Sequence, residues 1–155
     1  MPQVEIRKAH EDELSRAVEI LAHWNMAPRA RSTECPDPEQ TGLAPDLTFV
    51  ALAEGRIVGV ASFILLGGGW AETASLALDP AWRGQGLGER LQRARLAEMK
   101  ALGIRHVRTE ADRPETIAWY VRKFGYRVAG TVSKKHAFSL PDVGYWTVLT
   151  LDLDD

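Results

Sequence analysis

The sequence predicts a mixed α/β fold, in which one central sheet carries helices packed on it. Short runs of alternating apolar and polar residues recur along the chain, and amphipathic helical patterns separate some of them. Glycine and proline mark the turns between these runs. The resulting order is strand, helix, loop, three strands, helix, strand, helix and two strands, which gives a single layered unit of about seven strands.

Each strand is expected where apolar residues alternate or form a short run between turn residues. The expected strands cover residues 4–6, 48–53, 57–66, 70–78, 104–110, 127–138 and 145–153. Residues 54–56 are expected to form the tight turn of a hairpin. Residues 26–45 contain four prolines and no clear period, so we expect a loop or a short irregular helix there.

Three helices are expected from apolar residues spaced three and four apart. Their stripes are Leu14, Ala17, Val18 and Leu21; Leu87, Leu91, Ala94 and Leu102; and Ile117, Tyr120, Val121 and Phe124. The second helix is expected over residues 83–102 after a glycine-rich start, although Glu98 interrupts its stripe. Asp112 and Glu115 have the spacing of a capping box, which predicts the start of the third helix there. Gly103 and Gly125 follow the second and third stripes as expected stops.

The composition is that of one soluble globular domain, expected over residues 1–155. The chain is 45% hydrophobic and 26% charged with a net charge of −2, which favours neither nucleic acid nor an anionic membrane as a partner. Cys35 is the single cysteine, and no His/Cys cluster has zinc spacing, so neither an internal disulfide nor a metal is expected. A polar N-terminus and the lack of a long apolar run predict a cytoplasmic protein.

The most informative segment is a glycine-rich turn between a strand and a helix, residues 76–88. Asp79 and Pro80 end the strand, and Gly84, Gly86 and Gly88 then lead into the helix. A helix N-terminus offers free N–H groups and a partial positive charge, which suit a phosphate. The segment lacks the Gly-Lys-Ser/Thr of a triphosphate loop and the full dinucleotide fingerprint. Spacing alone therefore leaves two readings, an unspecified phosphate site and a turn that only packs.

The same segment resembles the acetyl-CoA signature of the GNAT acetyltransferase superfamily, Arg/Gln-x-x-Gly-x-Gly/Ala, through Arg83, Gly86 and Gly88. The preceding Leu-Ala-Leu-Asp-Pro is similar to the fourth strand and turn of that family, and Phe-Gly-Tyr at 124–126 replaces its usual Leu-Gly-Phe. The resemblance spans residues 49–126. It implies a mixed, mostly antiparallel sheet of about seven strands, flanked by helices and splayed between strands 4 and 5.

The resemblance also implies acetyl-CoA as a co-substrate and direct acetyl transfer to an amine, without a covalent enzyme intermediate. The CoA diphosphate would lie on backbone N–H groups of Arg83, Gly84, Gln85, Gly86, Leu87 and Gly88. The pantetheine arm would run like an added strand beside Leu76, Ala77 and Leu78. Cys35 stands alone in an irregular stretch, and nothing marks it as a nucleophile.

Three residues are candidates for proton transfer. Glu72 is the first candidate for the base, because relatives often carry a glutamate on this strand, and Glu110 is the second. Either residue is equally well explained as a solvated strand residue. Tyr120 is the candidate acid that protonates the CoA thiolate. The tyrosine of the family, however, corresponds to the position of Val121 in this sequence. Tyr120 is therefore also explained as an aromatic residue of the core. The asparagine of the family near this helix start is replaced by Asp112 or Arg113.

The acceptor is expected to be a small-molecule amine, with an anionic amine as the narrower hypothesis. The residues expected around its pocket are His23, Trp24, Arg29, Arg31, Lys134, Lys135, His136 and Trp146. The alternative is a non-catalytic acyl-CoA-binding or regulatory module, and a nucleotide transferase is a third reading. A homodimer is expected from the family alone.

Overall fold

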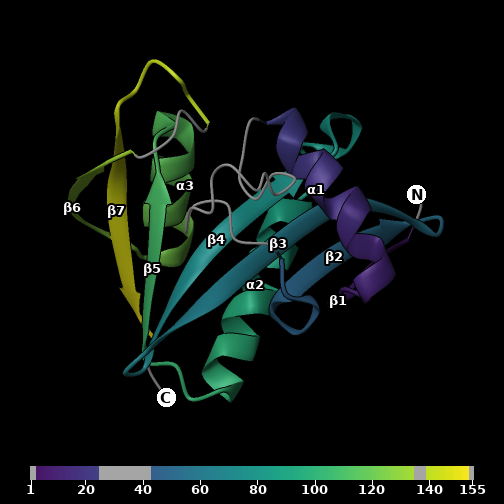
Figure 1. Cartoon of the computed structure of the whole chain (residues 1–155), viewed down its shortest axis with the longest axis horizontal. Helices are drawn as coiled ribbons and strands as arrows, with labels where there is room; N and C mark the ends of the chain where they lie inside the picture. The colour runs from purple at the N-terminus through teal and green to yellow at the C-terminus, as the bar shows by residue number, and fades with distance from the viewer. Residues whose placement is uncertain (1–2, 25–42, 135–138, 154–155) are drawn as a thin grey trace, which may run out of the picture.

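A seven-stranded sheet forms the centre of the computed structural model, which describes residues 3–24, 43–134 and 139–153. The strands are β1 (Val4–Lys8), β2 (Thr48–Ala53), β3 (Arg56–Gly67), β4 (Trp70–Leu78), β5 (His106–Ala111), β6 (Arg127–Ser133) and β7 (Tyr145–Asp152). Their order across the sheet is β1-β2-β3-β4-β5-β7-β6, and every neighbouring pair is antiparallel except β4–β5 (Figure 1). The predicted mixed, mostly antiparallel sheet is confirmed.

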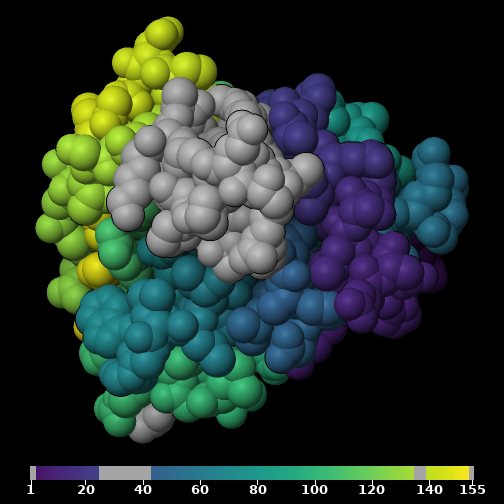
Figure 2. All heavy atoms as spheres, in the orientation of Figure 1, coloured from purple at the N-terminus to yellow at the C-terminus, as the bar shows by residue number. Residues whose placement is uncertain are grey.

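Helices cover both faces of this sheet (Figure 1). They are α1 (Leu14–His23), α2 (Leu87–Ala101) and α3 (Pro114–Phe124). The short 3-10 turns Glu11–Glu13, Pro45–Leu47 and Pro80–Trp82 precede α1, β2 and α2, respectively. The alternation along β2 separates the two faces, because Val50 packs in the cluster of α1 and Ala51 in the cluster of α2. In the space-filling view, α1 and the β6–β7 end of the sheet flank the visible face on opposite sides (Figure 2).

The parallel pair β4–β5 is only partly joined. Its register has four residue pairs, from Trp70–His106 to Thr73–Thr109, and the Thr109 hydroxyl donates to the Thr73 carbonyl at 2.9 Å. Beyond these threonines, β4 continues to Leu78 and β5 to Ala111 without pairing with each other. The predicted splay between the fourth and fifth strands is therefore present, and it opens the centre of the sheet.

A β-bulge lies next to this opening. Ser62 of β3 pairs with Ser75 of β4, but Phe63 pairs with Thr73, so Ala74 is an extra residue on β4. A bulge bends its strand and changes which side chains face each side of the sheet. The side chains of β4 therefore change face as the strand enters the unpaired region.

Helix boundaries differ from the sequence expectation at three points. The capping-box prediction is wrong, because Arg113 occupies the N-cap position of α3 and the Asp112 carboxylate accepts hydrogen bonds from other segments. The second helix begins at Leu87, so Gly84 and Gly86 precede it and Gly88 lies in its first turn. Leu102 follows α2 and is 51% exposed, so it does not belong to the buried stripe.

The remaining expectations fall partly outside the described residues. β6 ends at Ser133, and residues 135–138, expected to extend it, are not described. Most of the loop expected over residues 26–45, with Cys35, also lies outside the described part of the chain. In the part that is described, no helix is both long enough and apolar enough to cross a bilayer.

Candidate functional site

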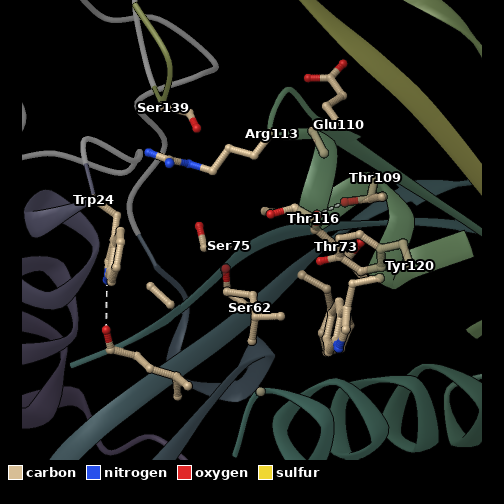
Figure 3. Close-up of a pocket in the computed structure, with 18 of the residues that line it drawn as sticks. Trp24, Ser62, Thr73, Ser75, Thr109, Glu110, Arg113, Thr116, Tyr120 and Ser139 are labelled. Carbon is tan, nitrogen blue, oxygen red and sulfur yellow. Dashed lines mark hydrogen bonds between the residues drawn. The ribbon is translucent and has the colours of Figure 1, made fainter. Parts of the chain in front are cut away.

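A cavity of about 840 Å³ occupies the gap between the unpaired ends of β4 and β5. Its walls come from β3, β4, β5, the start of α2 and one side of α3, and Trp24 closes it at the end of α1 (Figure 3). Leu76, Ala77 and Leu78, the predicted pantetheine strand, line it. A cavity of this size is typical of small-molecule and cofactor sites.

The glycine turn forms one end of the cavity. Gly84 and Gly86 both have φ of +78°, and a Cβ atom at either position would meet no heavy atom within 4 Å. Backbone conformation, rather than crowding, is therefore what favours glycine at these two positions. Asp79 fixes the preceding turn by accepting from the Ala81 amide at 3.0 Å, and Arg16 of α1 pairs with the same carboxylate at 3.0 Å.

The N-terminus of α2 faces this end. Arg90 N–H donates to the Gly86 carbonyl in the first bond of the helix, so the amides of Leu87, Gly88 and Glu89 have no acceptor within the helix. Gly84, Gly86 and Gly88 line the cavity. Leu87 is 3% exposed and packs its side chain against the sheet, so only its amide is available to a ligand. Free amides at a helix N-terminus suit an anion.

Arg83 and Trp24 close the cavity beside the turn. The Arg83 guanidinium lies 4.9 Å from the centre of the Trp24 ring, and the Trp24 indole N–H donates to the Leu78 carbonyl at 2.8 Å (Figure 3). These contacts join the end of α1 to the end of β4. Among the described residues, the Arg83 guanidinium has no hydrogen bond or ion pair, so its N–H groups are available for an anion while the Trp24 ring holds its position.

Two glutamates flank the threonines that end the β4–β5 pairing: Glu72 precedes Thr73 in the paired part of β4, and Glu110 follows Thr109 in the unpaired part of β5. Glu72 and Glu110 both line the cavity, and Arg108 lies between them, with Nη2 2.7 Å from a Glu110 oxygen and Nε 3.5 Å from a Glu72 oxygen. Burial, together with the negative charge of Glu110, raises the pKa of Glu72 to about 7, although Arg108 opposes this change. Glu72 is thus suited to exchange a proton near neutral pH.

A buried arginine, Arg95, holds the Tyr120 hydroxyl in place. It lines the cavity but is only 5% exposed, and its hydroxyl accepts a hydrogen bond from Arg95 Nη2 at 2.8 Å. Because a guanidinium has donors only, the phenolic proton must point to another acceptor. Tyr120 is therefore both a core aromatic, packed on Tyr126, and a hydroxyl at the cavity wall.

Arg95 is fully buried, and its described partners include no carboxylate. Its Nη1 donates to the carbonyls of Ser62 and Ser75, at 2.9 and 2.8 Å, and its Nε donates to Gln92 at 2.6 Å. The two serines are the last pair before the bulge. Arg95 thus satisfies carbonyl groups where the bulge interrupts the ladder. This residue was not identified from the sequence, although its place four residues after Leu91 puts it on the buried face.

A buried ion pair fastens residues 139 and 140 near the end of β5. Lys134 Nζ lies 2.7 Å from an Asp112 oxygen, and the Ser139 hydroxyl and Leu140 amide donate to the same carboxylate at 2.7 and 2.9 Å. Burial raises the pKa of Asp112, but these hydrogen bonds outweigh burial and hold it below its usual value. Lys134 also lies 4.4 Å from the centre of the Trp146 ring, which lines the cavity.

The structure separates the predicted acceptor residues. Lys134 is buried in its pair with Asp112, so the hypothesis that it holds a substrate anion is not supported. His23 is exposed and packs edge-on against Trp24 without lining the cavity. Arg29, Arg31, Lys135 and His136 lie outside the described residues. Trp24 and Trp146 are the predicted residues that do reach the cavity.

Comparisons with known proteins agree with this geometry. A sequence model of the acetyltransferase (GNAT) family matches residues 17–126. The fold is similar to that of Ard1 from Thermoplasma volcanium, at a TM-score of 0.76 and 18% identity over 98% of this chain and 99% of that one. Against the ribosomal-protein-S18-alanine N-acetyltransferase of Escherichia coli, the TM-score is 0.72 at 19% identity, over 97% and 94% of the two chains.

A third similar structure was solved with a ligand. N-acetylglutamate synthase from Neisseria gonorrhoeae, complexed with coenzyme A and L-arginine, matches at a TM-score of 0.72 and 18% identity, over 100% of this chain and 34% of that one. A comparison with curated protein sequences gave no significant match. At these identities, the structural matches show a shared fold.

Proposed function

Because the chain belongs to the acetyltransferase (GNAT) family, we propose that it transfers the acetyl group of acetyl-CoA to an amine acceptor by direct attack on the thioester. The observation that carries this proposal is the layout of the open sheet centre. Free helix amides and Arg83 lie at one end of the gap between β4 and β5, and Glu72 lies at the other. One elongated ligand with an anionic end and a reactive end fits such a site.

The diphosphate of acetyl-CoA is assigned to the amides of the glycine turn and the first turn of α2, with Arg83 beside it. Each charge-assisted hydrogen bond contributes about 1.5–3 kcal/mol, so a few of them hold a diphosphate without a metal. The amide groups of the pantetheine arm would pair with the backbone of Leu76, Ala77 and Leu78. This part of β4 has a free edge because β5 has diverged from it.

Glu72 is assigned as the base. A lysine-type amine has a pKa of about 10.4, so only about one molecule in 10³ is unprotonated at pH 7, and deprotonation costs roughly 4–5 kcal/mol. A carboxylate with a pKa of about 7 takes up a proton from the ammonium better than an ordinary glutamate does. Glu110 keeps the pKa of Glu72 high and is a secondary candidate for the same role.

Tyr120 is assigned as the acid. The amine nitrogen bonds to the thioester carbon, backbone amides in the unpaired part of β4 stabilise the oxyanion, and the carbon–sulfur bond then breaks. The leaving thiolate takes the phenolic proton of Tyr120. The ammonium loses two protons in all: the first passes to Glu72 before the attack, and the second leaves the nitrogen as the carbon–sulfur bond breaks and restores the phenol of Tyr120 through solvent. Glu72 then releases its proton to solvent. Arg95 supports this step because its hydrogen bond to the phenolic oxygen leaves the proton directed elsewhere.

The cofactor assignment is tested by thermal unfolding with and without acetyl-CoA. At a ligand concentration of 100 Kd, stability rises by about 2.7 kcal/mol, which shifts the Tm by roughly 5–10 °C for a domain of this size. The double variant Arg83→Glu, Gly86→Glu should abolish the shift.

The matched control is Gly55→Glu, Arg56→Glu, which changes the same residue types in the exposed β2–β3 turn, where Gly55 has φ of +76°. This variant should retain the shift. The absence of a shift at millimolar acetyl-CoA in the wild type would refute the cofactor assignment. If acetyl-CoA does bind, measuring the release of CoA in the presence of an amine acceptor distinguishes an enzyme from a module that only binds CoA.

A further inference from the structure

A second arginine points into the cavity from the wall opposite Trp24. Arg113 follows β5 at the N-cap of α3, and its side chain extends from the end of β5 across the cavity (Figure 3). Within the described part of the chain, its guanidinium makes no hydrogen bond or ion pair. An arginine that is directed into a cavity and pairs with no carboxylate is available to a ligand.

Most of the other charged side chains near this wall are already paired. Arg108 pairs with Glu110 at 2.7 Å, and Lys134 pairs with Asp112 at 2.7 Å. Lys123, at the far side of α3, pairs with Glu89 at 2.8 Å. Asp112 and Glu110 are thus each held by another cation. Glu115, two residues after Arg113, also lines the cavity, but it is exposed and makes no ion pair with Arg113. Among the described residues, Arg113 therefore faces the cavity as a positive charge that no carboxylate pairs with.

Arg113 is separated from the end of the cavity assigned to the cofactor diphosphate. That end is built by the β4–α2 turn and Arg83, which follow β4, whereas Arg113 follows β5 on the other side of the splay. Glu72 lies on β4 and Glu110 on β5, and Arg108 supplies one positive charge to the two carboxylates, so a net negative charge remains to attract an ammonium group when both are ionised. The cavity therefore offers separate sites for a positive and a negative group of one acceptor.

We propose that Arg113 binds an anionic group, carboxylate or phosphate, of the acceptor, so that the preferred acceptor is an amine that carries a negative charge. This inference rests on the proposed function, and it identifies the substrate class of the same site. The planar guanidinium pairs with both oxygens of a carboxylate or phosphate, which a lysine ammonium does not.

The test uses pairs of acceptors that differ only in the anionic group. Acetyl transfer is followed by CoA release for ω-amino acids of increasing length, for their amides, and for phosphoethanolamine beside ethanolamine. The wild type should prefer the anionic member of at least one pair by about 10- to 100-fold in kcat/KM, the range expected of one charge-assisted pair. Arg113→Gln should remove this preference while changing kcat/KM for the neutral member less than about threefold.

Two further variants test whether the charge or the geometry of Arg113 sets the acceptor preference. Arg113→Lys keeps the charge but loses the two-pronged geometry, and it should retain only part of the preference. Arg122→Gln removes the same charge from an exposed position of α3 that does not line the cavity, and it should behave as the wild type. Binding of acetyl-CoA to every variant is measured in parallel by thermal unfolding.

The outcomes separate this inference from the proposed function. Equal rates for anionic and neutral acceptors in the wild type would overturn it, as would an equal loss for both in Arg113→Gln. If Arg113→Gln binds acetyl-CoA more weakly but keeps the acceptor preference, Arg113 belongs to the cofactor site, and this inference is wrong. If acetyl-CoA binds but no anionic amine reacts, the substrate class is wrong and the cofactor site stands. Failure of acetyl-CoA to bind would refute the proposed function itself.

Discussion

Replacing Glu72 by glutamine should stabilise the folded protein at alkaline pH while removing acetyl transfer. The pKa of Glu72 is raised in the folded state to about 7 from an ordinary value of 4.5, mainly by burial and then by Glu110. The folded state therefore binds the proton of Glu72 more tightly than the unfolded state does. Stability supplied by the protonated form is present below pH 4.5 and is lost as the pH rises through 7.

The size of the effect follows from that difference in pKa. At 1.36 kcal/mol per pH unit, the ionised Glu72 costs the folded state about 3 kcal/mol at pH 8. Near pH 4.5 the cost is well below 1 kcal/mol, because the carboxyl is still protonated in the folded state. Glutamine has a similar shape and no charge, so Glu72→Gln should raise the Tm at pH 8 by roughly 6–12 °C.

The assay is thermal unfolding of the wild type and Glu72→Gln from pH 4.5 to 8.5. The difference in Tm should grow with pH and level off above 7. Glu115→Gln is the control, because Glu115 also lines the cavity but is exposed. A variant that is less stable than the wild type at pH 8, or a difference that does not depend on pH, would refute the reasoning about the burial of Glu72.

Three further predictions concern the surroundings of the site. Glu110→Gln removes a negative charge and should lower the pKa of Glu72. In a profile of kcat/KM against pH for the same acceptor, the rising limb should therefore move to lower pH. A rising limb that does not move would contradict the coupling between the two glutamates. Arg95→Met leaves buried carbonyls without donors and should destabilise the fold by more than about 3 kcal/mol in denaturant unfolding; a loss below 1 kcal/mol would show that they find other partners. Asp112→Asn breaks a buried ion pair and should cost about 3–5 kcal/mol at pH 7. Because the folded-state pKa of Asp112 is depressed, this cost should shrink as the pH falls through it, and an equal cost at pH 7 and pH 3 would exclude the ionic contribution.

The strands were predictable where the pattern is local. Residues 48–53 and 70–78 each show an apolar strand pattern that lies between turns marked by glycine or charged residues. The observed bounds of β2 and β4 agree with the prediction. The third helix was placed correctly, but its start was not, because Asp112 has the composition of a cap and is instead held by Lys134, 22 residues further along the chain. A contact at that separation leaves no local trace in the sequence.

The same distinction applies to the candidate site. The glycine turn is contiguous in sequence, so its residues were identifiable together. Arg95 was not, because the carbonyl groups that require it belong to Ser62 and Ser75 and become available only at a bulge formed by strand pairing. The ion network around Glu72 depends on the register that places Arg108 beside it on the neighbouring strand. Periodicity within one strand does not contain that information.

The four residue pairs that join β4 to β5 have a consequence for how the protein opens. They are the seam between two blocks of the sheet, β1–β4 and β5–β7, and beyond Thr73 and Thr109 the two blocks face each other across the cavity. A ligand that pairs with the free edge of β4 extends this seam. Amide hydrogen exchange in residues 76–78 and 110–111 should therefore slow when acetyl-CoA binds, and the two blocks should then unfold as one cooperative unit.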